Sequence, residues 1–269
     1  MTDAAPNYDA YQGAFHEAFR LELSGILDAL PVPQSGHVID VPCGNGFYTR
    51  RIADRLGTSD RLTAVDSSDE YLRLTREAVA GTTVEVQKGN AYHLPFPDAT
   101  FDLVWCAQSL ISLDPTRAVR EMFRVVKPEG VVAILEVDEF HRVILPWPIK
   151  LEAALPLAVQ KATVQKYGDS AKTSPARKLR GILKDAGFKS VHRVTHSFDR
   201  AAPFDPLTTT FLTHHFKYLR SFAYPHLSAS LQKSFDRMTD PDEADSLYRL
   251  PDAELVCINA IYLSRPSPE

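Results

Sequence analysis

The chain has 269 residues, of which 44% are hydrophobic and 24% charged, so it is long enough to bury a sizeable core. Its formal net charge of -4 argues against a general nucleic-acid or membrane-surface binder, because such proteins need a basic face. The start of the chain is polar, no apolar run approaches about 20 residues, and the three cysteines are scattered. These features predict a cytoplasmic protein without signal peptide or membrane span. Its expected partner is a small molecule.

The first predicted element is an amphipathic helix over residues 8–30. Its apolar residues recur at steps of three and four: Tyr8, Tyr11, Phe15, Phe19, Leu23, Ile26 and Leu30. Pro31 and Pro33 end the pattern. On this pattern alone, the helix packs against the core.

A strand, a sharp turn and a helix are predicted next, over residues 38–56. The turn contains Gly44 and Gly46, which lack a Cβ and therefore let a ligand approach the main chain at a helix N-terminus. A nicotinamide-binding G-x-G-x-x-G loop is disfavoured, because its third glycine would fall on Thr49 and Asp40 has no place in that pattern.

A second strand is predicted over residues 61–66, and it ends in an acid about 20 residues past the glycine turn. At such a place a carboxylate can accept hydrogen bonds from both hydroxyls of a ribose, which favours Asp66 as a ribose ligand. The competing role, capping the helix predicted over 68–79, is better met by Ser67 or Ser68.

The remaining strands and helices alternate to the end of the chain, as in α/β proteins. Strands are predicted over 83–88, 101–106, 131–137, 188–194 and 254–263, and helices over 115–126 and 179–187. Polar or ligand-lining residues are expected just past the fourth strand, at Cys106 to Ser109, because open parallel sheets bind ligands outside their carboxyl ends. Gln108 is the polar candidate there.

Four short motifs together resemble the class I S-adenosylmethionine-dependent methyltransferases. Asp40, Cys43, Gly44 and Gly46 match an acid followed by G-C-G-x-G, and Pro42 departs at the first glycine. Residues 89–96 are similar to G-D-A-x-x-L-P-F with Asn90 at the acid, residues 101–104 match F-D-x-V, and residues 127–130 approach K-P-G-G. The resemblance covers residues 37–138 well, and 175–197 and 254–264 loosely.

The resemblance implies one methyltransferase domain over 1–269, with a doubly wound, mostly parallel seven-stranded sheet and S-adenosylmethionine as cofactor. It implies that Asn90 accepts from the adenine amino group, that the backbone N–H of Ala91 meets a ring nitrogen, and that the helix over 8–30 closes as a lid. The expected cofactor-binding residues are Tyr11, Asp40, Pro42, Gly44, Gly46, Asp66, Ser67, Asn90, Ala91, Cys106 and Gln108.

Two helix-like insertions, residues 139–174 and 198–252, fall outside the resemblance, and in the resembled fold such insertions cap the substrate. A neutral histidine suits a general base for a hydroxyl acceptor, and the candidates are His214, His215 and His141. The competing interpretation of the second insertion is a core-packing aromatic stripe. No H-E-x-x-H spacing is present, and the neighbours His214 and His215 point apart on a helix, so no metal is expected.

The favoured function is methyl transfer to a small aromatic or apolar molecule of specialised metabolism, with oxygen preferred over nitrogen or carbon. Pro42 and Asn90 depart from the motifs at cofactor positions and motivate an alternative: a cofactor-binding lyase, cyclase or non-catalytic binding protein of the same fold. A nucleic-acid methyltransferase is disfavoured, because residues 106–110 lack the N/D-P-P-aromatic motif. The oligomeric state stays open.

Overall fold

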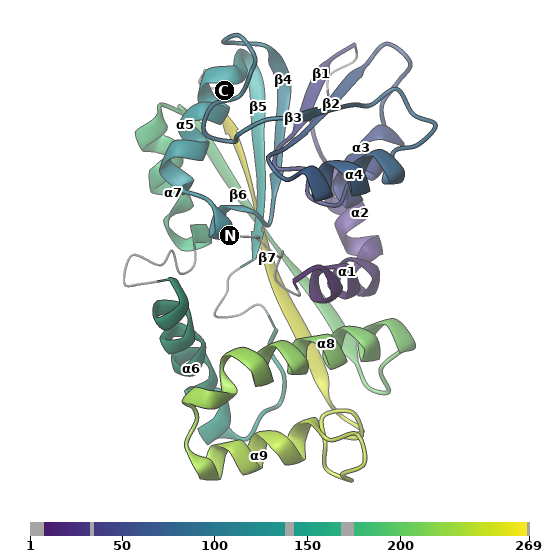
Figure 1. The fold of residues 1–269 in the computed structure, drawn as a ribbon, viewed down its shortest axis with the longest axis vertical. Helices are drawn as coiled ribbons and strands as arrows, with labels where there is room; N and C mark the ends of the chain where they lie inside the picture. Colours follow the sequence, from purple (N-terminus) through teal and green to yellow (C-terminus); the bar gives the residue numbers. More distant parts are fainter. Residues whose placement is uncertain (1–7, 33–34, 138–142, 168–174, 268–269) are drawn as a thin grey trace. The chain divides into compact units, whose positions relative to one another are not determined.

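The computed structural model describes residues 8–32, 35–137, 143–167 and 175–267, which form two compact units (Figure 1). The first, here called the sheet unit, comprises Ser24–Asp138, Ser174–His196 and Asn259–Glu269. The second, here called the helical unit, comprises Met1–Leu23, Glu139–Thr173 and Ser197–Ile258. Each unit is therefore assembled from three separate stretches of the chain.

The sheet unit is built on seven strands in the order β3-β2-β1-β4-β5-β7-β6. Their bounds are β1 (His37–Asp40), β2 (Arg61–Asp66), β3 (Glu85–Lys88), β4 (Phe101–Ala107), β5 (Val126–Val137), β6 (Ser190–Ala201) and β7 (Glu254–Arg265). The pairs β2–β3, β1–β2, β1–β4 and β4–β5 are parallel, whereas β7 runs antiparallel to β5. The predicted mostly parallel seven-stranded fold is confirmed.

Helices cover both faces of this sheet, which is why its central strands are continuous apolar runs. The helices are α3 (Phe47–Ala53), α4 (Asp69–Ala78), α5 (Pro115–Val125) and α7 (Pro175–Ala186), with a short 3-10 turn η1 (Leu110–Ser112). On one face, Met122 of α5 and Leu183 of α7 join Ile134 of β5 in the main buried cluster. On the other face, Tyr48 of α3 meets Trp105 of β4, with ring centroids 5.5 Å apart.

The main difference from the predicted elements is in β5, which begins at residue 126 rather than 131. Its first residue, Val126, pairs with Phe101 of β4. The register of the two strands then shifts between Phe101 and Leu103. Gly130 lies at this irregularity, where a Cβ would come within 2.9 Å of the Asp102 carbonyl oxygen. Close approach of two backbones explains the glycine.

The helical unit contains α1 (Tyr8–Ala18), α6 (Ile149–Tyr167), α8 (Pro206–Phe222), η2 (Tyr224–His226) and α9 (Ala229–Thr239), together with the start of α2 (Arg20–Asp28). The prediction of one helix over 8–30 is wrong in one respect, because a turn at Phe19 separates α1 from α2. Hydrogen bonds from Phe19 N to Phe15 O and from Leu23 N to Phe19 O continue across it. No helix in the described ranges has the length and apolarity needed to cross a bilayer.

Candidate functional site

The glycine turn between β1 and α3 lies at the carboxyl end of the sheet. Cys43 N donates to the carbonyl of Val65 on β2 at 2.9 Å, and Val41 N to that of Trp105 on β4 at 2.9 Å, so the turn is fastened to both neighbouring strands. Its first part includes a cis peptide bond before Pro42, the residue that departs from the family motif.

The two glycines of this turn serve different purposes. Gly44 has φ +54°, and no described atom lies within 4 Å of the position its Cβ would take, so its outer side is open. Gly46 has φ +82°, and a Cβ there would lie 2.9 Å from the Cα of Thr75 on α4. Gly46 is thus required by helix packing, whereas Gly44 leaves backbone accessible to a ligand.

Asp40 ends β1 as a buried carboxyl group, with 1% of its surface exposed. The Thr49 hydroxyl donates to its Oδ2 at 2.5 Å. Burial, reinforced by the charge of Asp66 and opposed by the Thr49 bond, raises the pKa of Asp40 to about 7. Asp40 therefore holds the start of α3 against the end of β1 and changes its charge near neutral pH.

This raised pKa predicts a pH-dependent contribution to stability. A carboxyl whose folded-state pKa exceeds its ordinary value of 3.8 stabilises the fold while protonated, and that contribution is lost as pH rises through about 7. Compared with the Asp40→Asn variant, the wild type should lose about 2 kcal/mol of unfolding free energy between about pH 5 and about pH 8. Urea denaturation of both proteins at the two pH values measures this, and an unchanged difference between them would contradict the raised pKa.

Asp66 at the end of β2 connects the glycine turn to the next helix. Its Oδ2 accepts from Gly44 N at 3.1 Å and its Oδ1 from Ser68 N at 2.9 Å, with 6% of the residue exposed. Burial raises the pKa of Asp66, and the backbone N–H groups of Ser68, Gly44 and Ser67 counteract this. The N-cap of α4 is Ser68, whose hydroxyl accepts from Tyr71 N, while Ser67 is exposed. The capping role is therefore filled without Asp66.

The loop after β3 carries Asn90 and Ala91. Asn90 is exposed, and its Oδ1 already accepts from Tyr92 N at 2.9 Å, so one lone pair of that oxygen is engaged in the turn itself. Ala91 is buried and belongs to the main cluster. The Tyr92 hydroxyl accepts from Asp114 N at 2.7 Å, which fixes this loop to the start of α5.

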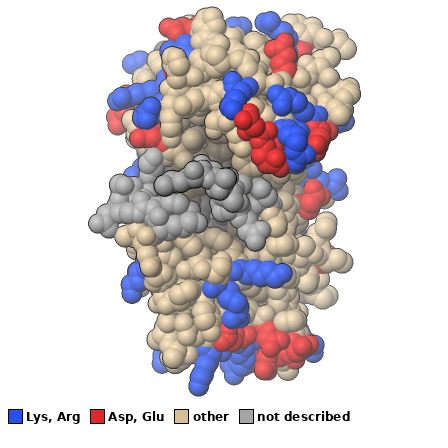
Figure 2. Space-filling view, viewed as in Figure 1, with Lys and Arg blue, Asp and Glu red and all other residues tan. Residues whose placement is uncertain are grey.

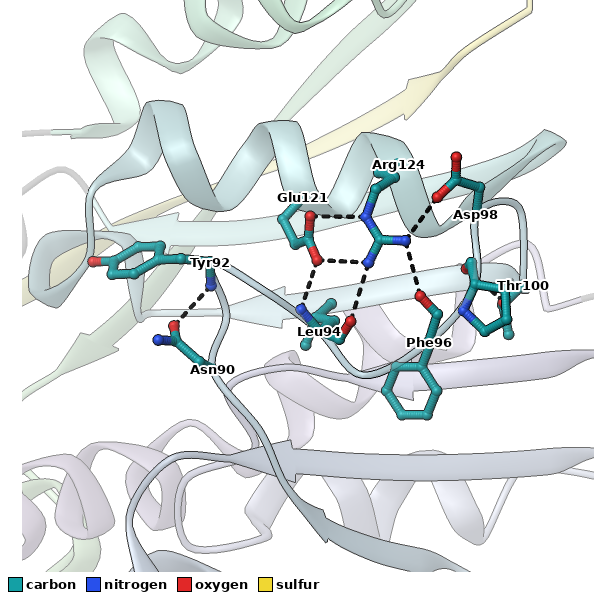
Figure 3. A network of polar contacts seen from close by, with 9 residues as sticks. Asn90, Tyr92, Leu94, Phe96, Asp98, Thr100, Glu121 and Arg124 are labelled. Atoms are coloured by element: carbon teal, nitrogen blue, oxygen red, sulfur yellow. Dashed lines mark hydrogen bonds and ion pairs between the residues drawn. The ribbon is translucent and has the colours of Figure 1, made fainter.

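A charged pair on α5 holds the far part of the same loop (Figure 3). Arg124 donates to the carbonyls of Leu94 and Phe96 at 3.1 and 2.8 Å, and also to Glu121 and Asp98. Glu121 Oε1 accepts from Leu94 N at 2.6 Å. Sequence reasoning missed this pair, although an acid and an arginine at i,i+3 in the last turns of α5 were the available signal.

Cys106 lies near the carboxyl end of β4. Its side chain is fully buried in the main cluster, and burial raises the pKa of the thiol well above its ordinary value. It lies there because alternate strand residues face opposite sides of the sheet, and Cys106 faces α5. The Cys106 side chain therefore lies in the core, and the expected place of this residue at the cofactor stays a prediction.

Gln108 follows at the end of β4 in a left-handed conformation, φ +52°, with 7% of its surface exposed. Its N–H donates to the Leu135 carbonyl at 2.7 Å. Glu136 of β5, which is 1% exposed, accepts from the N–H groups of Ser109 and Leu110 at 3.1 and 2.9 Å. This buried carboxyl fixes the turn and was not predicted as a site residue.

In the helical unit, Tyr11 of α1 meets His215 of α8. The Tyr11 hydroxyl lies 3.2 Å from His215 Nδ1, and the residues are 2% and 6% exposed. Tyr11 also stacks on Phe211 and Tyr218, with centroids 5.7 and 5.4 Å away. Two predicted residues are thus brought together from opposite ends of the sequence.

The other histidine candidates are placed differently. His214, one position before His215 on α8, is partly exposed, because adjacent helix residues point about 100° apart. His141 lies outside the described residues. In the part of the chain that the structure describes, no three His, Cys, Asp or Glu side chains gather as a metal site.

Comparisons with known proteins agree with this fold. A family model described as a methyltransferase domain matches residues 39–134. A demethylmenaquinone methyltransferase of Bacillus licheniformis is 31% identical over 183 residues, covering 61% of this chain and 75% of the relative. One of Bacillus cytotoxicus is 30% identical over 202 residues, covering 70% and 83%.

Solved structures share the fold at low sequence identity. The YcgJ protein of Bacillus subtilis has a TM-score of 0.59 at 16% identity and covers 93% of this chain and all of that one. A S-adenosylmethionine-dependent methyltransferase of Thermotoga maritima, titled a possible histamine N-methyltransferase, has a TM-score of 0.56 at 15% identity, covering 98% and 96%.

The chain belongs to the class I S-adenosylmethionine-dependent methyltransferases. It is an enzyme of that class and S-adenosylmethionine is its cofactor. The residues of the sheet unit fit this molecule: the outer side of Gly44 is open, and the buried carboxyl group of Asp66 lies directly beside it.

Proposed function

We propose that this methyltransferase acts on a small, apolar aromatic molecule that carries a hydroxyl group. The methyl group goes to that oxygen, or to a ring carbon that the oxygen makes nucleophilic. The observation that carries the proposal is the buried Tyr11–His215 contact within an aromatic cluster, because such surroundings suit an apolar ring and a proton-accepting imidazole suits a hydroxyl.

The sheet unit supplies the cofactor site in this proposal. Asp66 accepts hydrogen bonds from the ribose hydroxyls, the main chain at Gly44 approaches the cofactor closely, and the loop at Asn90 and Ala91 takes the adenine ring. Because Tyr92 N uses one lone pair of Asn90 Oδ1, the other remains for the adenine amino group. Arg124 and Glu121 keep this loop in place.

In the helical unit, His215 acts as the general base and Tyr11 orients it. In this role His215 has the tautomer in which Nδ1–H donates to the Tyr11 oxygen, and we assign proton uptake from the acceptor hydroxyl to Nε2. When bound, S-adenosylmethionine supplies an electrophilic methyl group and leaves as S-adenosylhomocysteine. The hydroxyl proton passes to the imidazole as the new bond to the methyl carbon forms and the carbon–sulfur bond breaks.

The relatives and the surface charge support a small apolar acceptor. Relatives of 27–31% identity are named demethylmenaquinone methyltransferase, which favours an oxygen-bearing ring as acceptor here. Figure 2 shows Lys and Arg interspersed with Asp and Glu on the viewed face rather than gathered in one basic area. Nucleic acid would favour such an area.

A panel of acceptors tests the proposal directly. Purified protein is incubated with S-adenosylmethionine and, separately, 1,4-naphthohydroquinone, 1-naphthol, catechol or histamine, and products are identified by mass spectrometry. We expect methylation of hydroxyl-bearing rings and none of histamine. Methyl transfer to the amine alone would contradict the proposal, and fragmentation of the product tells oxygen from carbon methylation.

The proposed base predicts a selective loss of activity. His215→Gln should lower kcat/KM by about 100-fold, because general base catalysis typically contributes that much or more. Tyr11→Phe should lower it about tenfold, as expected for a lost orienting hydrogen bond. His214→Gln is the matched control on the same helix and should retain wild-type activity.

If His214→Gln and His215→Gln lower kcat/KM equally, His215 is not the general base. Calorimetric titration with S-adenosylhomocysteine should give wild-type affinity for His214→Gln and His215→Gln, because neither histidine is among the expected cofactor-binding residues. Cofactor binding without methyl transfer to any acceptor would instead favour the alternative that Pro42 and Asn90 motivate. The [4+2]-cyclase SpnF shares the fold, with a TM-score of 0.52 at 18% identity.

A further inference from the structure

Asn259 on β7 is a fully buried polar residue whose carboxamide is unsatisfied. None of its surface is exposed, and neither Nδ2 nor Oδ1 has a hydrogen-bond partner among the described residues. Burying an amide without partners costs stability, so such groups are rare unless they serve a purpose. The methyl-transfer residues proposed above do not include it.

The strand register places Asn259 at the ligand-binding edge of the sheet. It pairs with Val137, the last residue of β5. Because β4 and β5 are parallel, Val137 lies at their carboxyl end, and open α/β sheets bind ligands outside this end.

The same register tells which face of the sheet Asn259 occupies. Asp40, Trp105, Ala133 and Leu263 form one lateral row across β1, β4, β5 and β7. Asn259 lies four residues before Leu263 on β7, so it shares the face of Asp40. It also lies about 13 Å farther toward the carboxyl ends than that row.

The position separates Asn259 from the proposed ribose and adenine sites. β7 is three strand spacings from β1, about 14 Å, and Asp66 lies on β2, one spacing farther on. The amide is also electrically neutral and lies among buried apolar residues, Leu135, Val137 and Ile261, which share its face. In such surroundings, burying a neutral polar group of a ligand costs less free energy than burying a charged one.

We propose that Asn259 recognises an oxygen of the methyl acceptor. Its Nδ2 donates to the oxygen of one ring hydroxyl, or its Oδ1 accepts the proton of that hydroxyl, so the ring satisfies one of the two unpaired atoms. This inference rests on the proposed function, because it assumes a hydroxyl-bearing acceptor. Asn259 is then a specificity-determining residue that sets the orientation of the ring.

Replacement of Asn259 by leucine tests this role, because the two side chains have similar size. The variant should unfold at the same or a higher temperature than the wild type, since it removes an unsatisfied buried amide. Its affinity for S-adenosylhomocysteine should stay within about twofold of wild type, as measured by calorimetry. Its kcat/KM for 1,4-naphthohydroquinone should fall about tenfold or more, mainly through KM.

Ser264→Ala is the matched control on the same strand. Ser264 is also fully buried and unsatisfied, but it pairs with Val132, at the opposite end of the β5 pairing. This variant should likewise keep its stability, and its kinetics with the acceptor should remain those of the wild type. Equal kinetic losses in both variants would contradict a specific role for Asn259.

A second acceptor separates recognition from general damage. The wild type should prefer 1,4-naphthohydroquinone over 1-naphthol, which lacks one hydroxyl, by about tenfold, and Asn259→Leu should lose that preference. If the wild type is active and Asn259→Leu keeps the preference for 1,4-naphthohydroquinone, the role of Asn259 is refuted and the proposed function is not. A wild type inactive on every hydroxyl-bearing ring would refute the proposed function, and this inference with it.

Discussion

Asp66→Ala is expected to weaken the binding of S-adenosylmethionine at least about tenfold in calorimetric titration, because the loss of a hydrogen bond to a charged group costs about 1.5–3 kcal/mol. The carboxyl group is fixed by the N–H groups of Gly44 and Ser68, so little entropy is lost when it binds a ribose. S-adenosylhomocysteine should show the same loss, because it carries the same ribose.

Asp69→Ala is the matched control for this measurement. Asp69 is an exposed acid in the first turn of α4, where it pairs with Lys88 at 2.8 Å. The variant removes the same charge nearby without touching the glycine turn, and cofactor affinity should not change. If Asp66→Ala also leaves the affinity unchanged while the protein stays folded, Asp66 is not part of the site.

Alanine at Gly44 and alanine at Gly46 should produce opposite defects. Gly46→Ala forces a left-handed backbone on a residue whose Cβ would meet α4, so the free energy of unfolding should fall by about 3 kcal/mol. Gly44→Ala places its methyl group in open space and should lose only about 1 kcal/mol. Urea denaturation of the two variants without ligand measures both values.

Cofactor affinity should be impaired more in Gly44→Ala than in Gly46→Ala, the reverse of their order in stability loss. The added methyl group of Gly44→Ala occupies the space where a ligand approaches the main chain, so affinity for S-adenosylhomocysteine should fall at least about tenfold. Gly46→Ala, studied at a temperature where it is folded, should bind better than Gly44→Ala. Normal cofactor affinity in Gly44→Ala would show that the ligand does not approach this side of the turn.

The parts of the structure that could be predicted are those specified by nearby residues. Alternating apolar strands and periodic helices predicted the sheet, since burial on both faces gives parallel strands a continuous apolar pattern. The glycine turn and Asp66 could be recognised for the same reason, because backbone freedom and strand position act locally. The distinct task of Gly46 could not, because it depends on the approach of Thr75 from α4.

Contacts between residues far apart in the sequence explain most of the features that could not be predicted. Tyr11 and His215 are 204 residues apart, so their hydrogen bond could not be derived from spacing, although both were candidates. Cys106 was assigned to the site from its strand end, but strand alternation turns its side chain into the core. Asn259 could be predicted only as a strand residue, because whether its amide finds hydrogen-bond partners depends on the folded structure around it.

The position of β7 also bears on how the chain is synthesised and folded. β7 lies between β5 and β6 in the sheet, although it is the last strand along the chain. Until residues 254–265 leave the ribosome, β5 presents an unpaired hydrophobic edge, which is a risk for aggregation. Truncations that remove this strand should therefore yield insoluble protein rather than a smaller active enzyme.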